Sequence, residues 1–241
     1  MRHRGGSPMP RRFVDSWLRP PDTSSLERML KSCCELGFWA VAVEVDDKFW
    51  SEAKRLTSSY GLEIFRRVTL HPSSKGELYN LLRNVRWKCD LVSVVTNIRD
   101  VFMAAARDMR VDTVVANHID AVYLDRHVVQ VAVNSFEVVF SNIAVQGFES
   151  VRNSMRVVRT AYRSRLKLIV SSGAQDEFSL RSPRQLASIP WCLGAGPDFA
   201  LNTVSTTPAK ILVENRGRLE GRISPEGVWR LVEGEEEVSP N

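Results

Sequence analysis

An arginine repeat between residues 148 and 164 is the clearest chemical pattern in this sequence. Its members recur at intervals of four, three and four residues: Arg152, Arg156, Arg159 and Arg163. On an α-helix this spacing puts all four on one face, in a row about 16 Å long. Only Glu149 is spaced to neutralise one of them, three residues before Arg152. Because a guanidinium binds two phosphate oxygens at once, the repeat predicts contact with a phosphate-bearing partner; an ordinary solvated face is the alternative.

The same helix has a predicted core face one residue earlier, formed by Val151, Met155, Val158 and Tyr162. Other basic positions extend the set of candidates for binding phosphate groups of a nucleic acid: Arg66, Arg67, Arg107, Arg181 and Arg184. Aromatic residues are sparse among these arginines. We therefore expect recognition of a nucleic-acid backbone or shape rather than stacking on single-stranded bases.

A second candidate site is a run of small residues: Ser171, Ser172, Gly173 and Ala174. Such residues bring backbone N–H groups close to an anion, and a helix beginning at Ser182-Pro183 would add its positive end. A short turn that requires small residues is the alternative. The segment lacks the G-x-S-x-G motif of a nucleophilic serine, and the chain has no G-x-G-x-x-G or Walker-type phosphate loop. We predict no catalytic residue.

Metal ligands are also scarce. The chain contains four histidines, His3, His71, His118 and His127. His71 and His118 follow predicted strands, and a metal site there would need carboxylates such as Asp15, Asp112 or Asp120 nearby. Solvated loop histidines are the simpler interpretation, so we predict no metal site.

The elements that position these residues alternate regularly. Apolar, β-branched runs predict strands at 12–18, 38–43, 62–69, 90–95, 113–116, 137–141 and 166–172, with a doubtful eighth near 199–202. Amphipathic stretches of helical length separate them. This rhythm predicts a single-domain α/β protein, a TIM-barrel-like (β/α) barrel spanning residues 12–216. Residues 1–11 are expected to form a disordered leader, and residues 217–241 an appended hairpin and acidic tail.

Composition narrows the class of protein. The 241 residues are 44% hydrophobic and 25% charged, which excludes a largely disordered chain. Lys and Arg outnumber Asp and Glu by 33 to 28, and this basic balance favours phosphate-bearing partners. The four cysteines form no C-x-x-C pair, and the longest apolar run, 38–43, is too short to span a bilayer. We expect a cytoplasmic protein without a membrane partner.

Several strings resemble one family. They are Asp90-Leu-Val-Ser-Val, Asn97, Val101-Phe-Met-Ala-Ala-Ala-Arg107 with Arg110 and Asp112, Leu168-Ile-Val-Ser-Ser-Gly-Ala174, Leu180-Arg-Ser-Pro-Arg184, Pro208, Ile211-Leu212 and Asn215. Their order and spacing resemble the archaeal ribonuclease P protein component 3 family, which includes the thirty-kilodalton subunit of the eukaryotic enzyme. The similarity runs from about Phe13 to Asn215, and its middle blocks are the specific ones.

The resemblance implies a barrel related to the polymerase-and-histidinol-phosphatase metal hydrolases. It also implies a noncatalytic subunit of ribonuclease P, the endoribonuclease that removes the 5′ leader from precursor tRNA. The implied partners are the catalytic RNA, a small second protein component in a two-plus-two heterotetramer, other protein subunits, and precursor tRNA. The RNA is expected to need Mg²⁺, and this chain no cofactor.

The metal-binding motifs of those hydrolases are altered at the matching positions. Their D-x-H-x-H motif matches Asp15, Trp17 and Arg19, and their S-D-A-H motif matches Ser172, Gly173, Ala174 and Gln175. The histidines are absent from both. Two other functions remain open from the sequence: a stand-alone barrel hydrolase acting on a phosphorylated small molecule, and a scaffold that binds only proteins.

Overall fold

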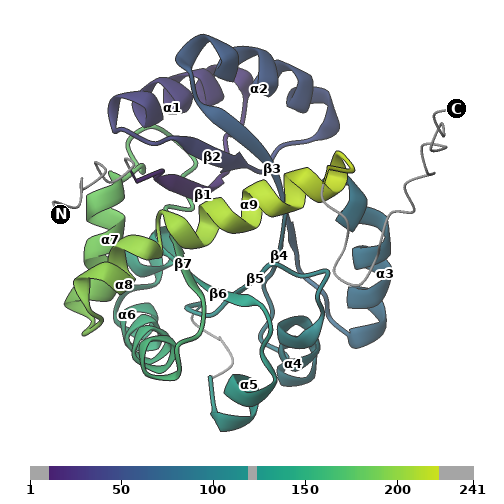
Figure 1. Ribbon diagram of the computed structural model, residues 1–241, viewed down its shortest axis with the longest axis vertical. Coiled ribbons are helices and arrows are strands. Elements are labelled where there is room, and N and C mark those ends of the chain that lie inside the picture. Colours follow the sequence, from purple (N-terminus) through teal and green to yellow (C-terminus); the bar gives the residue numbers. More distant parts are fainter. Residues whose placement is uncertain (1–10, 119–123, 223–241) are drawn as a thin grey trace, which may run out of the picture.

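Parallel strands in chain order form the centre of the protein. The computed structural model describes residues 11–118 and 124–222 (Figure 1). Within these ranges, seven strands pair in the order β1-β2-β3-β4-β5-β6-β7, and every pair is parallel. The strands are β1 (Val14–Leu18), β2 (Ala40–Val43), β3 (Glu63–Leu70), β4 (Leu91–Val94), β5 (Thr113–Val115), β6 (Ser135–Val139) and β7 (Leu168–Ser171). The TIM-barrel-like prediction is confirmed.

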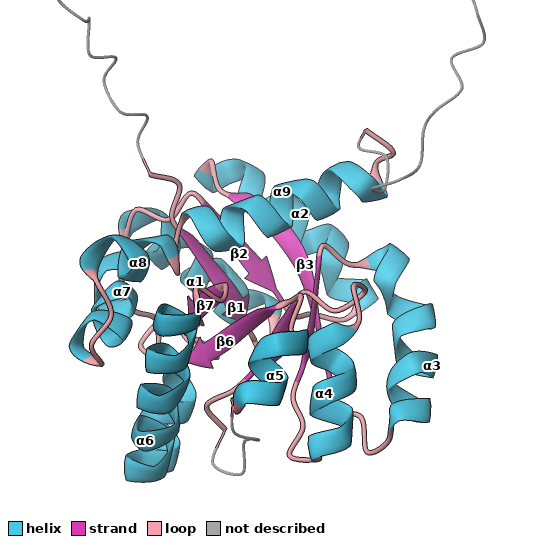
Figure 2. Cartoon of the chain, turned by 60° about the horizontal axis from the view of Figure 1, so that its bottom comes forward, coloured by secondary structure: helices cyan, strands magenta, loops and turns pink. Residues whose placement is uncertain are grey.

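Helices cover the outer side of the barrel and one of its ends (Figure 2). They are α1 (Thr23–Glu35), α2 (Asp47–Tyr60), α3 (Lys75–Val85), the 3₁₀ turn η1 (Arg86–Lys88), α4 (Arg99–Arg107), α5 (Arg126–Val131), α6 (Phe140–Ser164), α7 (Pro183–Cys192), α8 (Pro197–Asn202) and α9 (Thr206–Leu219). Because helices cover its outer face, the sheet is apolar on that side, with buried residues such as Val41, Val92 and Val170 packing against them. No helix in the described part of the chain is long and apolar enough to cross a membrane.

The barrel closes between β1 and β7 without an eighth strand in the described residues. At one end Leu18 bridges Ala174, and the Arg19 N–H donates to the Ala174 carbonyl over 2.8 Å. At the other end, two residues after α8 complete the closure: the Val14 N–H donates to the Val204 carbonyl and the Val170 N–H to the Thr203 carbonyl. The doubtful strand near 199–202 is therefore wrong, since these residues form α8.

Helix α9 lies across the end of the barrel where the strands begin (Figure 1). The Asn215 amide donates to the Asp90 carbonyl and to Asp112 Oδ1, each over 2.8 Å. The Arg216 guanidinium binds both carboxylate oxygens of Asp90 at 2.7 Å. These contacts hold α9 against the residues that precede β4 and β5. The same helix continues to Leu219, so a helix and not a hairpin occupies 217–219; residues 1–10 and 223–241 lie outside the described residues.

A buried ion pair crosses the interior of the barrel. Arg67 of β3 and Glu137 of β6 are both fully buried and form two hydrogen bonds, of 2.7 and 2.9 Å. Five further groups form hydrogen bonds with the pair. Arg67 donates to the Ser16 carbonyl and the Thr69 hydroxyl, and Glu137 accepts from the hydroxyls of Ser93, Thr113 and Ser171. Strands β1, β3, β4, β5, β6 and β7 thus share one polar network.

We expect Arg67→Met to lower the free energy of unfolding by about 3–5 kcal/mol, because it leaves the Glu137 charge buried without a partner. Urea denaturation followed by circular dichroism measures the change. Glu52→Gln, which removes one partner of an exposed pair on α2, is the control and should leave stability near the wild-type value. Equal stability of the Arg67 variant and the wild type would contradict the structural role of the pair.

Candidate RNA interface

Helix α6 packs on the barrel through small and polar residues rather than through the predicted apolar stripe. Its buried residues are Ser150, Asn153, Ser154, Val157, Val158 and Ala161. Val151 and Tyr162 are exposed, so the predicted core face is correct only at Val158. The reason is hydrogen bonding to the segment after β5: Ser150 Oγ donates to the Asn117 carbonyl, and the Asn117 side-chain amide donates to Ser154 Oγ.

The arginine repeat lies on the outer surface of this helix. Arg156, Arg159 and Arg163 are exposed. Arg152 is half-buried, and its guanidinium lies 2.7 Å from Glu149, the pairing expected from the sequence. The exposed part of the repeat therefore presents three cationic side chains along one helix.

Two further candidates lie next to α6. Arg181 has its guanidinium 4.7 Å from the centre of the Phe140 ring, at the start of α6, and donates to the carbonyls of Phe178 and Leu180. Arg184 is exposed in the first turn of α7. Since α7 packs on α6, these arginines and the repeat belong to neighbouring elements of the barrel.

The other candidates are not brought to this surface. Arg107 is exposed at the end of α4, which α5 separates from α6 around the barrel (Figure 1). Arg66 forms an ion pair with Asp47 and lies 5.8 Å from the Trp50 ring. Arg67 is wrong as an RNA-binding residue, because its side chain is fully buried and paired with Glu137.

The small-residue segment 171–174 is also wrong as an anion-binding loop. All four residues are buried. The Ser172 N–H donates to Asp15 Oδ1 and the Ala174 N–H to Ser172 Oγ, each over 3.1 Å, so these amides are already occupied. Gly173 has a left-handed φ of 65°, and a side chain there would collide with Ser141 and Val139. Small residues are needed here because the segment is closely packed. This agrees with the alternative stated from the sequence, a short turn that requires small residues.

Asp15 lies beneath this segment, fully buried. It accepts hydrogen bonds from the N–H groups of Trp17 and Ser172. Its Oδ2 is buried and has no hydrogen-bond partner among the described residues. Burial raises the pKa of this carboxyl from 3.8 to about 6, and the hydrogen bonds only partly oppose the shift.

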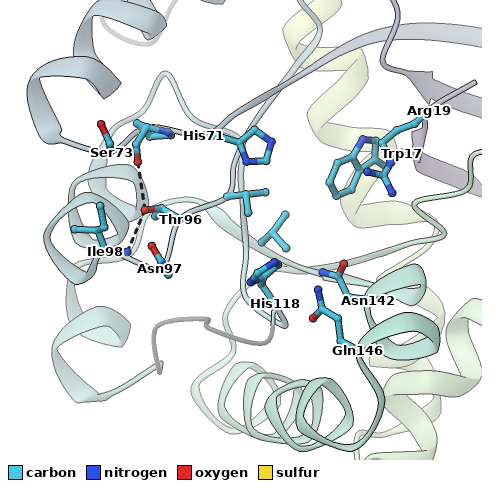
Figure 3. Close-up of a pocket in the computed structure, with 13 residues that line it drawn as sticks. Trp17, Arg19, His71, Ser73, Thr96, Asn97, Ile98, His118, Asn142 and Gln146 are labelled. Carbon is cyan, nitrogen blue, oxygen red and sulfur yellow. Dashed lines mark hydrogen bonds between the residues drawn. The ribbon is translucent and has the colours of Figure 1, made fainter. Parts of the chain in front are cut away.

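Above Asp15, the strand ends form a pocket of about 530 Å³ at the mouth of the barrel (Figure 3). Trp17 and Arg19, which the sequence resemblance matches to metal-binding histidines of the polymerase-and-histidinol-phosphatase hydrolases, both line this pocket. Their side chains do not fit a cation: Arg19 is itself cationic, and the Trp17 indole N–H donates to Glu44 over 2.7 Å. His71 and His118 also line the pocket, but two histidines do not make a metal site.

The other expected carboxylates do not complete such a site. Asp112 precedes β5 at the opposite end of the barrel, where it binds Arg86 and Asn215. Asp120 lies outside the described residues. Among the residues that the structure describes, no three His, Cys, Asp or Glu side chains come close enough to hold a metal ion.

Comparison with known families decides the classification. The sequence profile described as RNase P subunit p30 matches residues 12–220. The chain belongs to this family. Membership makes it a subunit of ribonuclease P and confirms the resemblance found in the sequence. The match also extends through the end of α9, which supports treating that helix as part of the p30 fold.

Individual p30 relatives are distant in sequence. Ribonuclease P protein component 3 of Methanococcoides burtonii is 23% identical over 208 residues, covering 82% of this chain and 85% of the relative. The same component of Methanosarcina barkeri is 25% identical, covering 90% and 93%. Among solved structures, a chain of the cryo-EM structure of archaeal ribonuclease P with mature tRNA aligns with a TM-score of 0.76 at 18% identity, covering 93% of this chain and 100% of that one. This last likeness supports the fold.

The raised pKa of Asp15 predicts a pH dependence of stability for this p30 protein. The folded chain keeps a proton that the unfolded chain releases, so stability falls as pH rises from about 4 to about 6. Asp15→Asn keeps a neutral acceptor for the Trp17 and Ser172 amides. We expect its stability relative to wild type to increase by about 3 kcal/mol between pH 4 and pH 7.

Urea denaturation at a series of pH values measures this difference. Asp198→Asn, at an exposed carboxylate paired with Arg11, is the matched control and should follow the wild-type profile. A stability difference between Asp15→Asn and wild type that does not vary with pH would show that Asp15 is ionised throughout.

Proposed function

We propose that this chain is a noncatalytic subunit of ribonuclease P that binds the catalytic RNA and supports removal of the 5′ leader from precursor tRNA. The observation that carries the proposal is the p30 family match over residues 12–220. The donor chemistry of the barrel mouth supports a noncatalytic role, because Trp17 and Arg19 stand where the related hydrolases bind metal. In this proposal the RNA performs the cleavage.

The RNA contacts are assigned to the exposed arginines of α6 and the start of α7. Arg156, Arg159, Arg163 and Arg184 are exposed, and guanidinium groups bind phosphate through paired N–H donors. Arg152 and Arg181 lie at the edges of this surface with partners of their own. Arg107 and Arg66 would serve a different RNA segment, since they lie on other elements.

Protein partners belong to the same proposal. We assign to the chain a small second component, with two copies of each in a heterotetramer, together with other ribonuclease P proteins and precursor tRNA. Exposed apolar side chains support protein contact: Phe148 on α6 is 77% exposed, and Val145 beside it is 83% exposed. The proposal assigns no cofactor to this chain and leaves Mg²⁺ to the RNA. A cytoplasmic location is supported by four free cysteines.

A stand-alone phosphatase is not favoured. That hypothesis depended on the segment 171–174 as a phosphate-binding loop, and the amides of Ser172 and Ala174 are engaged inside the protein. The Ser182 hydroxyl and the Gln185 side chain also form a capping box at the start of α7, which occupies N–H groups there.

Replacing Arg156, Arg159 and Arg163 together by alanine should weaken RNA binding and flatten its dependence on salt. Each phosphate contact contributes about 0.7–0.9 to the slope of log affinity against log salt concentration. Filter binding to ribonuclease P RNA at several salt concentrations measures the slope. Arg55→Ala, at an exposed arginine of α2, is the control and should keep the wild-type slope. An unchanged slope in the triple variant would exclude α6 from the RNA interface.

Reconstitution tests the function as a whole. Catalytic RNA and the remaining subunits are assembled with and without this chain, and precursor-tRNA cleavage is measured at low Mg²⁺ concentration. We expect cleavage to fall when the chain is omitted, because its cationic side chains reduce the repulsion between RNA phosphates that Mg²⁺ otherwise screens. Equal cleavage rates with and without the chain would overturn the proposed function.

A further inference from the structure

We infer that the pocket at the barrel mouth binds a nucleoside monophosphate, either as a free nucleotide or as one unstacked nucleotide of an RNA. The pocket is formed by residues at or after the ends of β1, β3, β4 and β5 and by the first turns of α6. Its volume of about 530 Å³ falls within the range of roughly 300–1,000 Å³ that is usual for small-molecule sites. Recognition of a free nucleotide goes beyond the proposed function, whereas recognition of an RNA nucleotide rests on it.

The pocket contains a cation with unused hydrogen-bonding capacity. Arg19 donates from Nη2 to the Gly173 carbonyl over 3.1 Å, and its guanidinium lies 4.8 Å from the centre of the Trp17 ring. Its Nε is buried and has no hydrogen-bond partner among the described residues. Burial also lowers the pKa of Arg19, since its charge is partly removed from water. An anion at this position would supply the missing acceptor and offset that cost.

An unpartnered acceptor lines the same pocket. Gln146 Oε1 is buried and has no hydrogen-bond partner in the described part of the chain. Asn142, one helical turn earlier, uses its amide nitrogen to donate to Asn117 over 3.3 Å. Buried polar atoms without partners are rare in folded proteins. The two orphan atoms therefore indicate a ligand with an anionic group for Arg19 and a hydroxyl or N–H donor for Gln146.

Electrostatics favour an anion in this pocket. The described residues that line it include Arg19, His71 and His118 but no Asp or Glu. Glu44 acts on Arg19 from outside the lining, and its oxygens already accept hydrogen bonds from the Trp17 indole N–H and the Thr69 backbone N–H.

A second buried cation contributes to the field at the floor of the pocket. The Arg67 guanidinium lies 3.9 Å from the centre of the same Trp17 ring, and its charge acts on Arg19. Glu137 neutralises Arg67 directly. Arg19 is thus the cation left to pair with a ligand.

A nucleoside monophosphate combines the required groups. Its phosphate matches a guanidinium, and its ribose hydroxyls and base N–H groups donate hydrogen bonds. The Thr96 hydroxyl does not take part, because it is bonded to the Pro72 carbonyl and the Ile98 N–H and so braces the rim (Figure 3). Inorganic phosphate lacks the nucleoside donors and is expected to bind more weakly.

Titration of the 241-residue chain with adenosine or uridine 5′-monophosphate tests the free-nucleotide arm. Binding is followed by calorimetry and by NMR of the histidine side chains. We expect saturable binding with shifts of His71 and His118, while the signal of His127 on α5, which does not line the pocket, stays constant. Inorganic phosphate that binds as tightly as both nucleotides would overturn the assignment of a nucleoside ligand.

Two variants and a control test whether binding depends on the two unpartnered atoms, Arg19 Nε and Gln146 Oε1. Arg19→Gln removes a charge-assisted contact and should weaken binding about tenfold or more, and Gln146→Met removes a neutral one and should weaken it about three- to tenfold. Arg218→Gln, at the opposite end of the barrel on α9, is the control and should bind as wild type does. Thermal unfolding checks that each variant is folded. If Arg19→Gln is unstable because it loses the hydrogen bond to the Gly173 carbonyl, Gln146→Met alone tests the pocket.

The RNA arm uses footprinting of ribonuclease P RNA in the reconstituted holoenzyme. Loss of protection at one nucleotide with Gln146→Met, but not with Arg218→Gln, would support an RNA nucleotide as the occupant. Binding of free nucleotides alone would support a small-molecule occupant. Absence of both effects in a holoenzyme that still needs this chain for cleavage would overturn the pocket assignment and leave the proposed function intact.

Discussion

The ion pair between Arg67 and Glu137 is the interaction on which the rest of the barrel depends. Two opposite charges, both fully buried, are tolerated inside a protein only when their hydrogen-bonding groups are satisfied. Here the partners come from strands around the whole barrel, including Ser16, Thr113 and Ser171. The network therefore fixes which residues of β4, β5 and β7 point inward. A shift of one residue in β5 or β7 would turn the hydroxyl of Thr113 or Ser171 to the outside and remove a hydrogen bond from the buried Glu137 carboxylate.

This buried pair also determines what the mouth of the barrel can bind. Arg67 lies against the Trp17 ring, and Arg19 lies against the same ring nearer the opening. The indole thus contacts two arginines, one neutralised by Glu137 and one without an ion pair among the described residues. The mouth therefore carries an aromatic ring and a cationic side chain, and no carboxylate lines it among the described residues. The side chains of the mouth are consequently suited to bind anions. Their positions are set by the ends of the strands that carry them.

The spacing of apolar residues predicted the strands and helices well, because every strand and helix of the barrel buries one side against its neighbours. The seven expected strands are present. The segment 199–202 is instead part of α8, and the backbone of Thr203 and Val204 just after it supplies the hydrogen bonds that an eighth strand would make at that end of the barrel. Site predictions were less successful, since burial of a charged residue depends on its partner. Nothing local to Arg67 distinguishes it from Arg66, and only the acidic residue in the middle of another apolar strand, Glu137, could have indicated an internal pair. The buried face of α6 was missed for a similar reason: Ser150, Asn153 and Ser154 are buried by hydrogen bonds that no hydrophobic pattern records.

Helix α6 joins the two proposed contact surfaces. Its first turns, with Asn142 and Gln146, line the mouth, and its later turns carry the exposed Arg156, Arg159 and Arg163. Between them Gly147 adopts φ 63° and ψ −142°, a conformation open to glycine and strained for other residues, so that the helix axis is interrupted there. The interruption lets the first turns follow the strand ends while the later turns pack along the outside of the barrel. The residues of α6 that line the mouth and its exposed arginines therefore lie on opposite sides of Gly147 in one element.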